Sequence, residues 1–312
     1  MLIVDQQSYL GDQIGVSTSQ SVSLTINKRI GLAKKSIYDI KRIIKDSRSK
    51  VSGGIKTGLL LWESAVIPFL LNNCSTWFNM KKSDYDKLEK VQNLFLNCLL
   101  GVFKCPVPLM LWDLSVLSIH LRILKEKLTL YHHITCLPDS ALAHQVLLLQ
   151  ERLQLPSLLD EVAHFLNRYE LSDVGKYSKR EWKALVRNAL NSENREFLIR
   201  KAQNYKNIDY LSMAAEEYGI KDYFLKFDLA RARLKFRERS QCMTTCKLHF
   251  PSDKHNIETM FICPEDECLS IDSLSHWSRC IGYAHLRQSR DLSDDFHLLS
   301  YYQDIINLRR NE

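Results

Sequence analysis

The sequence predicts a mainly α fold: a multi-helix domain, then a helical connector and a small Cys3His zinc-binding module, with only a short β segment at the N-terminus. Three observations predict this fold class. Apolar residues recur every three or four positions along most of the chain, which is the period of an amphipathic helix. The 312 residues include only 10 Gly and 7 Pro, which favours long regular elements over many turns. The length is enough for about two domains that each bury a core, and a hydrophobic content of 45% excludes a disordered chain.

The first elements expected along the chain are a strand and a long helix. Residues 2–10, before Gly11, give the best strand signal. Residues 26–44 predict a helix, because they carry one apolar stripe: Ile26, Ile30, Ala33, Ile37, Ile40 and Ile44. Residues 58–71 are the most apolar stretch of the chain and predict a buried helix.

Further helices are expected through the middle of the chain. One covers 83–101, with Ser83 as its N-cap and Gly101 at its end. The others are expected at 116–136, 140–153, 157–169, 179–204 and 222–239. A short pair of strands is expected around 245–262.

The cysteine count and the hydropathy exclude two classes of protein. Nine Cys is an odd number and the N-terminus has no secretory signal, so we expect reduced, intracellular cysteines rather than a disulfide framework. The apolar stretch 58–71 contains Glu63 and Pro68 and is too short to span a bilayer, so no membrane insertion is expected.

The sequence carries no recognisable catalytic motif. It contains no Gly-rich phosphate loop, no nucleophile elbow and no HExxH. Asp294 and Asp295 precede a periodic apolar run, where acids complement a helix N-terminus, so we interpret them as a cap and not as a two-metal site. The chain as given is therefore not expected to be an enzyme, and no small-molecule substrate is expected.

Basic residues are concentrated in one early segment. Between Lys28 and Lys56, ten basic residues stand against two acids, a local net charge of +8 compared with +7 for the whole chain. Lys28, Lys35 and Arg42 are seven residues apart and lie opposite the isoleucine stripe, which predicts a cationic ridge. A phosphate backbone favours such a ridge because its neutralisation releases counterions. The predicted contacts are Lys28, Arg29, Lys34, Lys35, Lys41, Arg42, Lys45 and Arg48. The alternative is an ordinary solvated helix face.

A second basic segment runs from Lys226 to Lys247 and leads into a cysteine cluster. It has a local net charge of +5 and is rich in arginine, whose planar fork suits phosphate oxygens. The predicted contacts here are Arg231, Arg233, Lys235, Arg237 and Arg239. The adjacency suggests that the basic segment and the cysteine cluster serve one nucleic-acid ligand.

The cysteine cluster has the residue types of a structural zinc site. Cys263, Cys268, His276 and Cys280 follow the spacing Cys-x4-Cys-x7-His-x3-Cys, and zinc sites in small modules are commonly Cys3His. His276 and Cys280 are expected one turn apart on a short helix, capped by Asp272 or Ser273. The sequence therefore predicts one zinc ion per chain. The alternative is three buried thiols and a surface histidine.

Several motifs resemble those of a known family, in that family's order. They are YLGDQIG at 9–15, KRIGLA at 28–33, GGIKTGLLLWESAVIPFLLNN at 53–73, KLEKVQNLFLNCLLGV at 87–102, ARARLKFRERS at 230–240, and the Cys-Cys-His-Cys cluster. Together they resemble the C-terminal part of a non-LTR (LINE-type) retrotransposon reverse transcriptase. The resemblance implies a palm and primer-grip remnant at 1–17, a thumb at 18–104, a connector at 105–225, a basic segment with a zinc knuckle at 226–290, and a C-terminal helix at 291–312.

The resemblance also implies a function and a partner. The thumb of this family closes on template–primer, so the expected partner is RNA, DNA or an RNA–DNA duplex, and the expected location is the nucleus. The family's palm aspartates, which hold Mg²⁺ for polymerisation, have no counterpart in this sequence, so magnesium chemistry is expected only in the parent polymerase. Two alternatives remain open: a full reverse transcriptase whose start was mispredicted, and a helical protein-interaction scaffold.

Overall fold

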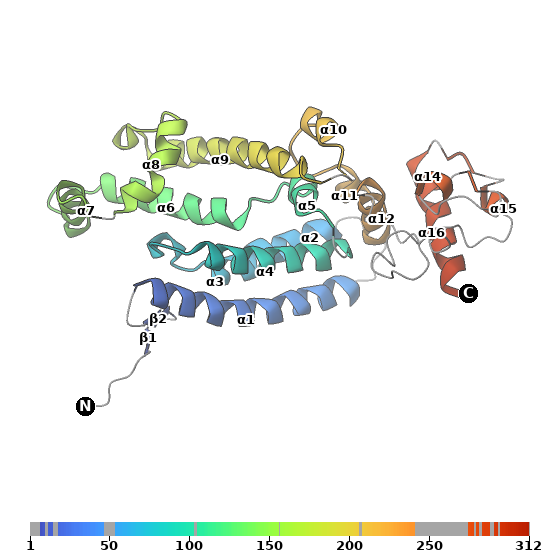
Figure 1. Ribbon diagram of the computed structural model, residues 1–312, viewed down its shortest axis with the longest axis horizontal. Helices are drawn as coiled ribbons and strands as arrows, with labels where there is room; N and C mark the ends of the chain where they lie inside the picture. The colour runs from blue at the N-terminus through green and yellow to red at the C-terminus, as the bar shows by residue number, and fades with distance from the viewer. Residues whose placement is uncertain are drawn as a thin grey trace.

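The fold is mainly helical, as the periodicity predicts (Figure 1). The computed structural model describes residues 7–9, 12–14, 18–46, 54–102, 105–155, 157–205, 208–240, 274–277, 279–280, 283–287, 290–292 and 294–311. The predicted strand pair at 245–262 lies outside them. Within the described ranges, no helix combines the length and the apolar character needed to cross a bilayer.

A small hairpin precedes the first helix. Strand β1 (Gln7–Tyr9) pairs antiparallel with β2 (Asp12–Ile14), with Gln7 opposite Ile14. The sequence predicts one strand before Gly11, and the structure adds a second strand after it. Three residues are too few for alternation to be visible in a sequence, which is why β2 was missed.

Helix α1 (Thr18–Asp46) confirms the predicted isoleucine stripe. Five of the six stripe residues are buried and Ile30 is partly buried, and the stripe packs against α4 (Lys82–Leu100) and β2. In Figure 1, α1 lies along one long edge of the molecule, with α4 on its inner side. The outer side of α1 is thus left to solvent.

The apolar stretch at 58–71 is helical, but it is not one regular helix. It forms α2 (Gly54–Leu61), a π-helical turn η1 (Trp62–Val66) and α3 (Ile67–Leu70). Pro68 explains the interruption, because it has no N–H to donate and its ring crowds the preceding turn. The short 3₁₀ turn η2 (Cys74–Thr76) follows before α4.

The remaining helices follow α4 in the chain. They are α5 (Val107–Asp113), α6 (Ile119–Thr135), α7 (Leu142–Arg152), α8 (Leu158–Arg168), η3 (Val174–Lys176), α9 (Lys179–Ala202), α10 (Tyr210–Ala215), α11 (Tyr223–Lys226), α12 (Leu229–Arg239), α14 (Leu274–Trp277), α15 (Ala284–Arg287) and α16 (Asp295–Asn311). Helices α1, α4, α6 and α9 contact one another in that order and form successive tiers (Figure 1).

Side-chain caps fix several of these boundaries. Ser157 and Ser178 each form a capping box, with Asp160 and Glu181 respectively, at the starts of α8 and α9. Asp294 accepts a hydrogen bond from the backbone N–H of His297, which confirms its predicted role as a cap of α16. The predicted helix at 222–239 is divided in two.

The division of that helix has a local cause. The side chain of Asp228 accepts a hydrogen bond from the backbone N–H of Arg231, and its extended backbone starts α12 as a new helix after α11.

The predicted N-cap of α4 is wrong. The helix begins at Lys82 after Lys81, which makes no side-chain cap, and Ser83 lies inside the first turn.

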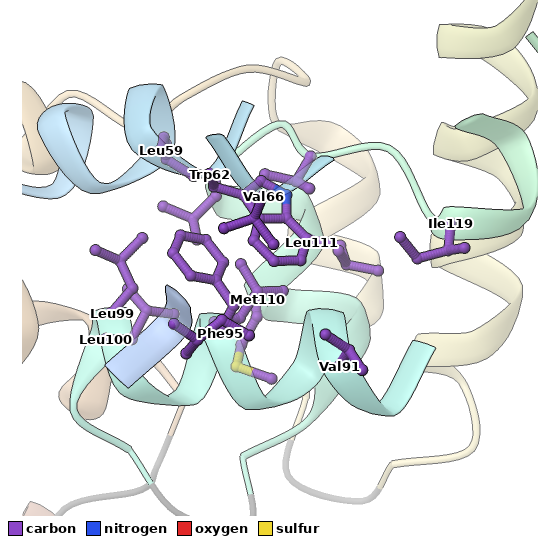
Figure 2. Packing of buried hydrophobic residues seen from close by; sticks show 14 of the residues in the cluster. Leu59, Trp62, Val66, Val91, Phe95, Leu99, Leu100, Met110, Leu111 and Ile119 are labelled. Atoms are coloured by element: carbon purple, nitrogen blue, oxygen red, sulfur yellow. The ribbon is translucent and has the colours of Figure 1, made fainter. Parts of the chain in front are cut away.

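Buried side chains form three clusters. The first combines α1 to α5 with the start of α6, the end of α9 and α10 to α12, so it runs across residue 104, where the predicted thumb ends. At its centre the rings of Trp62 and Phe95 stack, with centroids 4.4 Å apart and planes 11° from parallel (Figure 2). The second cluster joins α6 to α9, and the third joins α12 to α14 and α16.

Two glycines give opposite predictions for the same substitution. Gly101 ends α4 at φ 62°, and an added Cβ would lie 3.0 Å from Nη2 of Arg237. Gly101→Ala should therefore lower the free energy of unfolding by about 1–2 kcal/mol. Gly31 is exposed inside α1 with no atom near its virtual Cβ, so Gly31→Ala should raise the free energy of unfolding by about 0.5–1 kcal/mol. Urea unfolding of both variants checks the pair, and equal signs would contradict it.

Candidate nucleic-acid interface

The outer face of α1 carries five exposed cations. Lys28, Lys35 and Arg42 form one row along the helix, and Lys34 and Lys41 form a second row beside it. We call these five residues the α1 cationic face. Asp39 is also exposed, and its carboxylate is 3.7 Å from the Arg42 guanidinium in a solvent-exposed pair, an arrangement worth little in water. The α1 side chains of Lys45 and Asp46, and all of Arg48, lie outside the described residues.

An exposed aromatic ring lies between the two rows. Tyr38 is 56% exposed, and helical spacing places it one turn from Lys34 and Lys35 on one side and from Lys41 and Arg42 on the other. The predicted contacts omitted Tyr38. Its signal was present in the sequence as an aromatic residue off the apolar stripe, where burial does not account for it.

A shallow groove continues this face towards α3. It has a volume of about 450 Å³, and Lys28, Leu32 and Phe69 are among its lining residues. Leu32 and Phe69 are 48% and 41% exposed, so the groove offers apolar surface beside a cation. A base or a ribose is amphipathic in the same way.

Arg29 does not belong to the exposed face. It is buried, its guanidinium donates a hydrogen bond to the carbonyl of Asn72, and it lies 5.5 Å from the ring centroid of Trp77. Arg29 therefore fastens α1 to the segment between α3 and η2. Arg29 is three residues after Ile26 and four before Ala33, at the edge of the apolar stripe, so the helical spacing could have separated it from Lys28.

The arginines of α12 are also engaged inside the protein. Arg233 donates to the carbonyls of Leu99 (2.8 Å) and Cys98 (3.1 Å), and Arg237 donates through Nε to the carbonyl of Gly101 (3.1 Å). These carbonyls end α4, where cations are stabilised by the negative end of the helix. Burial, together with neighbouring Arg237, lowers the pKa of Arg233. The pair thus caps a helix rather than offering its charge to solvent.

Arg239 lies in a network of charges around the buried carboxylate of Asp113. Its guanidinium is 2.9 Å from Oδ2 of Asp113 and donates to both carboxylate oxygens of Glu216, at 2.7 and 2.6 Å. The hydroxyl of Tyr223 donates to Asp113 at 2.8 Å. Burial raises the pKa of Asp113 to about 6, although Arg239 and the Tyr223 hydroxyl act in the opposite direction. Four segments are joined at this point, so Arg239 holds α12 against the body of the protein.

The other two predicted contacts of α12 have acidic neighbours on their own helix. Lys235 is 2.9 Å from a carboxylate oxygen of Glu238, and Arg231 is 3.4 Å from one of Asp228. All five predicted contacts in this segment thus make ion pairs or carbonyl hydrogen bonds within the chain. The structure brings together the cations of α1, and it gives those of α12 internal partners.

Two of the four predicted zinc ligands lie outside the described residues, namely Cys263 and Cys268. His276 is half-buried on α14, and Cys280 is buried in the third cluster. Helix α14 ends at Trp277, so the expectation that both residues sit one turn apart on one helix is wrong. Among the described residues, no three His, Cys, Asp or Glu side chains are grouped to hold a metal ion.

A separate cleft lies between α4, α6, α8 and α9. It has a volume of about 790 Å³ and contains both charged and aromatic side chains, among them Tyr85, Lys127 and Glu161. The Lys127 ammonium donates to the Glu161 carboxylate and to the carbonyl of Trp77 (2.7 Å). Burial raises the pKa of Tyr85 to about 12, and Glu161 adds to this shift. The Lys127 ammonium is thus paired within the chain, and its side chain is only 4% exposed.

No family model, curated protein or solved structure matches this chain. The resemblance to a LINE-type reverse transcriptase therefore stays a prediction that rests on the motifs quoted above.

Proposed function

We propose that the chain binds nucleic acid through the α1 cationic face, as the C-terminal part of a non-LTR retrotransposon reverse transcriptase. The observation that carries the proposal is the burial pattern of α1. Its isoleucine stripe is turned inward while Lys28, Lys34, Lys35, Lys41 and Arg42 are exposed. The proposed activity is binding, and not nucleotidyl transfer.

The dimensions of α1 suit a nucleic-acid backbone. The helix has 29 residues and is about 43 Å long, and Lys28 and Arg42 are about 21 Å apart along its axis. That distance corresponds to about six nucleotide steps of one strand at 3.4 Å each. Contacts from lysine and arginine to phosphates do not distinguish between bases, so binding should be independent of the nucleotide sequence.

Fluorescence anisotropy with labelled probes tests the proposal. A short RNA–DNA duplex and a single-stranded RNA of the same sequence should both bind, and binding should weaken as a straight line in log–log terms as salt rises. Binding that is absent, or that is flat with salt, would favour the helical scaffold, in which the cations merely solvate α1.

Tyr38 separates the two probes. Unpaired bases can stack on an exposed ring between cations, whereas paired bases are already stacked within the duplex. Tyr38→Ala should weaken single-stranded RNA binding by about 1–3 kcal/mol, or roughly 5- to 150-fold, and leave duplex binding nearly unchanged. The control is Ile43→Ala, which removes another half-exposed side chain from the same helix. Equal losses for both probes would show that Tyr38 does not act by stacking.

We also propose that Cys263, Cys268, His276 and Cys280 hold one structural zinc ion. The donor set supports this, since Cys3His is a common set for zinc in small modules. Zinc would then supply folding free energy to the segment between α12 and α16. The proposed nucleic-acid binding implies RNA or DNA as the partner and the nucleus as the location.

A further inference from the structure

Helix α7 exposes most of its apolar residues. In α7 the one buried residue is Leu147, which belongs to the second hydrophobic cluster. The exposed large apolar residues of α7 are Leu142 (75%), Val146 (44%), Leu148 (46%) and Leu149 (51%), and they are followed by Leu153 (56%) at the C-cap and Leu155 (49%) beyond it. Concentrated exposure of this kind marks an interaction surface, whereas a single exposed leucine would be ordinary.

Four of these residues form a continuous seam. Leu142, Val146, Leu149 and Leu153 follow one another at steps of four, three and four, which is the a/d spacing of a coiled coil. Leu147 lies on the other side of the helix, towards the protein. The seam therefore points away from the body of the protein, where another helix can pack against it.

The seam is complementary to a second copy of itself in antiparallel orientation. When two copies of α7 cross head to tail about a two-fold axis, Leu142 of one copy meets Leu153 of the other, and Val146 meets Leu149. Every layer of the contact is then apolar on both sides. Because the spacing is symmetrical about its centre, no residue of the seam is left without an apolar partner.

Charges at the two ends of the helix favour the same orientation. Asp139 lies just before α7 with a side chain that is 99% exposed, and Arg152 is exposed in the last turn. Antiparallel pairing brings Arg152 of one copy to the end of the helix that carries Asp139 of the other. A parallel pair would place Asp139 beside Asp139 and Arg152 beside Arg152, and like charges repel.

The position of α7 leaves room for the second copy. In Figure 1 it lies at one extreme end of the molecule, beyond α6 and α8. It contacts α6. A two-fold axis at this tip would join two chains end to end, with their bodies pointing apart.

We propose that α7 is a dimerisation helix and that its partner is α7 of a second copy of this chain. The contact is short, with only four layers, and so it falls at the small end of specific interfaces. We therefore expect a weak dimer, with a dissociation constant in the micromolar range. The surface is separate from the α1 cationic face and requires no nucleic acid.

Sedimentation equilibrium of the full chain tests the proposal. The mass should rise from 36.4 kDa towards twice that value as the concentration passes through the micromolar range. The double variant Val146→Glu, Leu149→Glu should remain monomeric at every concentration, because it places four acids in the two central layers. Both residues are exposed in the monomer, so circular dichroism and the melting temperature should be nearly unchanged.

The matched control is Leu60→Glu, Leu211→Glu. It changes the charge equally at two residues that are 66% and 68% exposed on other helices, and it should dimerise like the wild type. A wild-type chain that is monomeric throughout would overturn the proposal and leave α7 to a different protein. A dimer that survives Val146→Glu, Leu149→Glu would overturn it as well.

Cross-linking tests the orientation. A mixture of Leu142→Cys and Leu153→Cys chains should form a disulfide between the two variants on oxidation, in excess of that formed by either variant alone. Preferential linking of Leu142→Cys to itself would indicate a parallel pair and contradict the antiparallel seam.

Discussion

Replacing Lys34, Lys35, Lys41 and Arg42 together by glutamine is expected to weaken binding of an RNA–DNA duplex by about 10³- to 10⁴-fold at about 0.1 M salt. Each phosphate contact adds about 0.9 to the slope of log affinity against log salt. Four contacts therefore multiply the association constant by about that factor as salt falls from 1 M to 0.1 M. Anisotropy titrations at fixed salt measure the loss. The four side chains are exposed, so the fold should not change.

A charge-matched control separates this face from the net charge of the protein. Lys179, Arg180, Lys183 and Arg187 are four exposed cations on α9, on the opposite side of the molecule from α1 in Figure 1. Both quadruple variants lower the formal charge from +7 by four. The α9 variant should lose less than about tenfold, as an effect of overall charge. Similar losses for the two variants would mean that the chain attracts polyanions through its overall field.

Trp62→Ala is expected to lower the free energy of unfolding by about 3–5 kcal/mol. Trp62 is fully buried in the π-helical turn and stacks on Phe95 (Figure 2). Its removal loses the stacking contact and leaves a cavity in the first cluster, where α2, α4 and α5 meet. Urea unfolding followed by circular dichroism measures the change in the free energy of unfolding.

Trp62→Phe should cost less than half as much. The indole Nε1 of Trp62 has no hydrogen-bond partner among the described residues, so the native side chain already carries a desolvation cost of about 1–3 kcal/mol. Phenylalanine keeps an aromatic ring against Phe95 and removes this N–H. If Trp62→Phe and Trp62→Ala were equally destabilising, the stacking and the cavity would not explain the loss.

Local periodicity was sufficient to predict the core side of α1. The stripe from Ile26 to Ile44 is a property of neighbouring residues, and the helix buries it as the spacing predicts. Gly101 was predicted to end α4 for the same kind of reason, since a left-handed residue after a helix favours glycine.

The partners of the basic residues could not be predicted in this way. Arg29 and Lys28 are adjacent in the sequence, but Arg29 reaches a carbonyl at Asn72. Arg233 and Arg237 reach carbonyls more than a hundred residues earlier in the chain. Which cations face solvent depends on tertiary contacts, and local charge density does not report those contacts.

Helix α7 shows the same limit for apolar residues. Its period was recognised at 140–153, and period alone suggests a side packed against the core. The helix instead packs through Leu147 and exposes the seam. The break before α12 could have been predicted from the sequence. Asp228 stands just ahead of a helical run, and an aspartate in that position is an N-cap signal.

We propose that the α1 cationic face contacts phosphates directly. The salt dependence of duplex affinity, compared between the wild type and the quadruple glutamine variant of α1, measures these contacts. The claim predicts that the log–log slope becomes shallower by about 3 to 4 in the variant, because four phosphate contacts are lost at about 0.9 each. Parallel lines for the two proteins would show that these side chains neutralise no phosphates, and would contradict the claim.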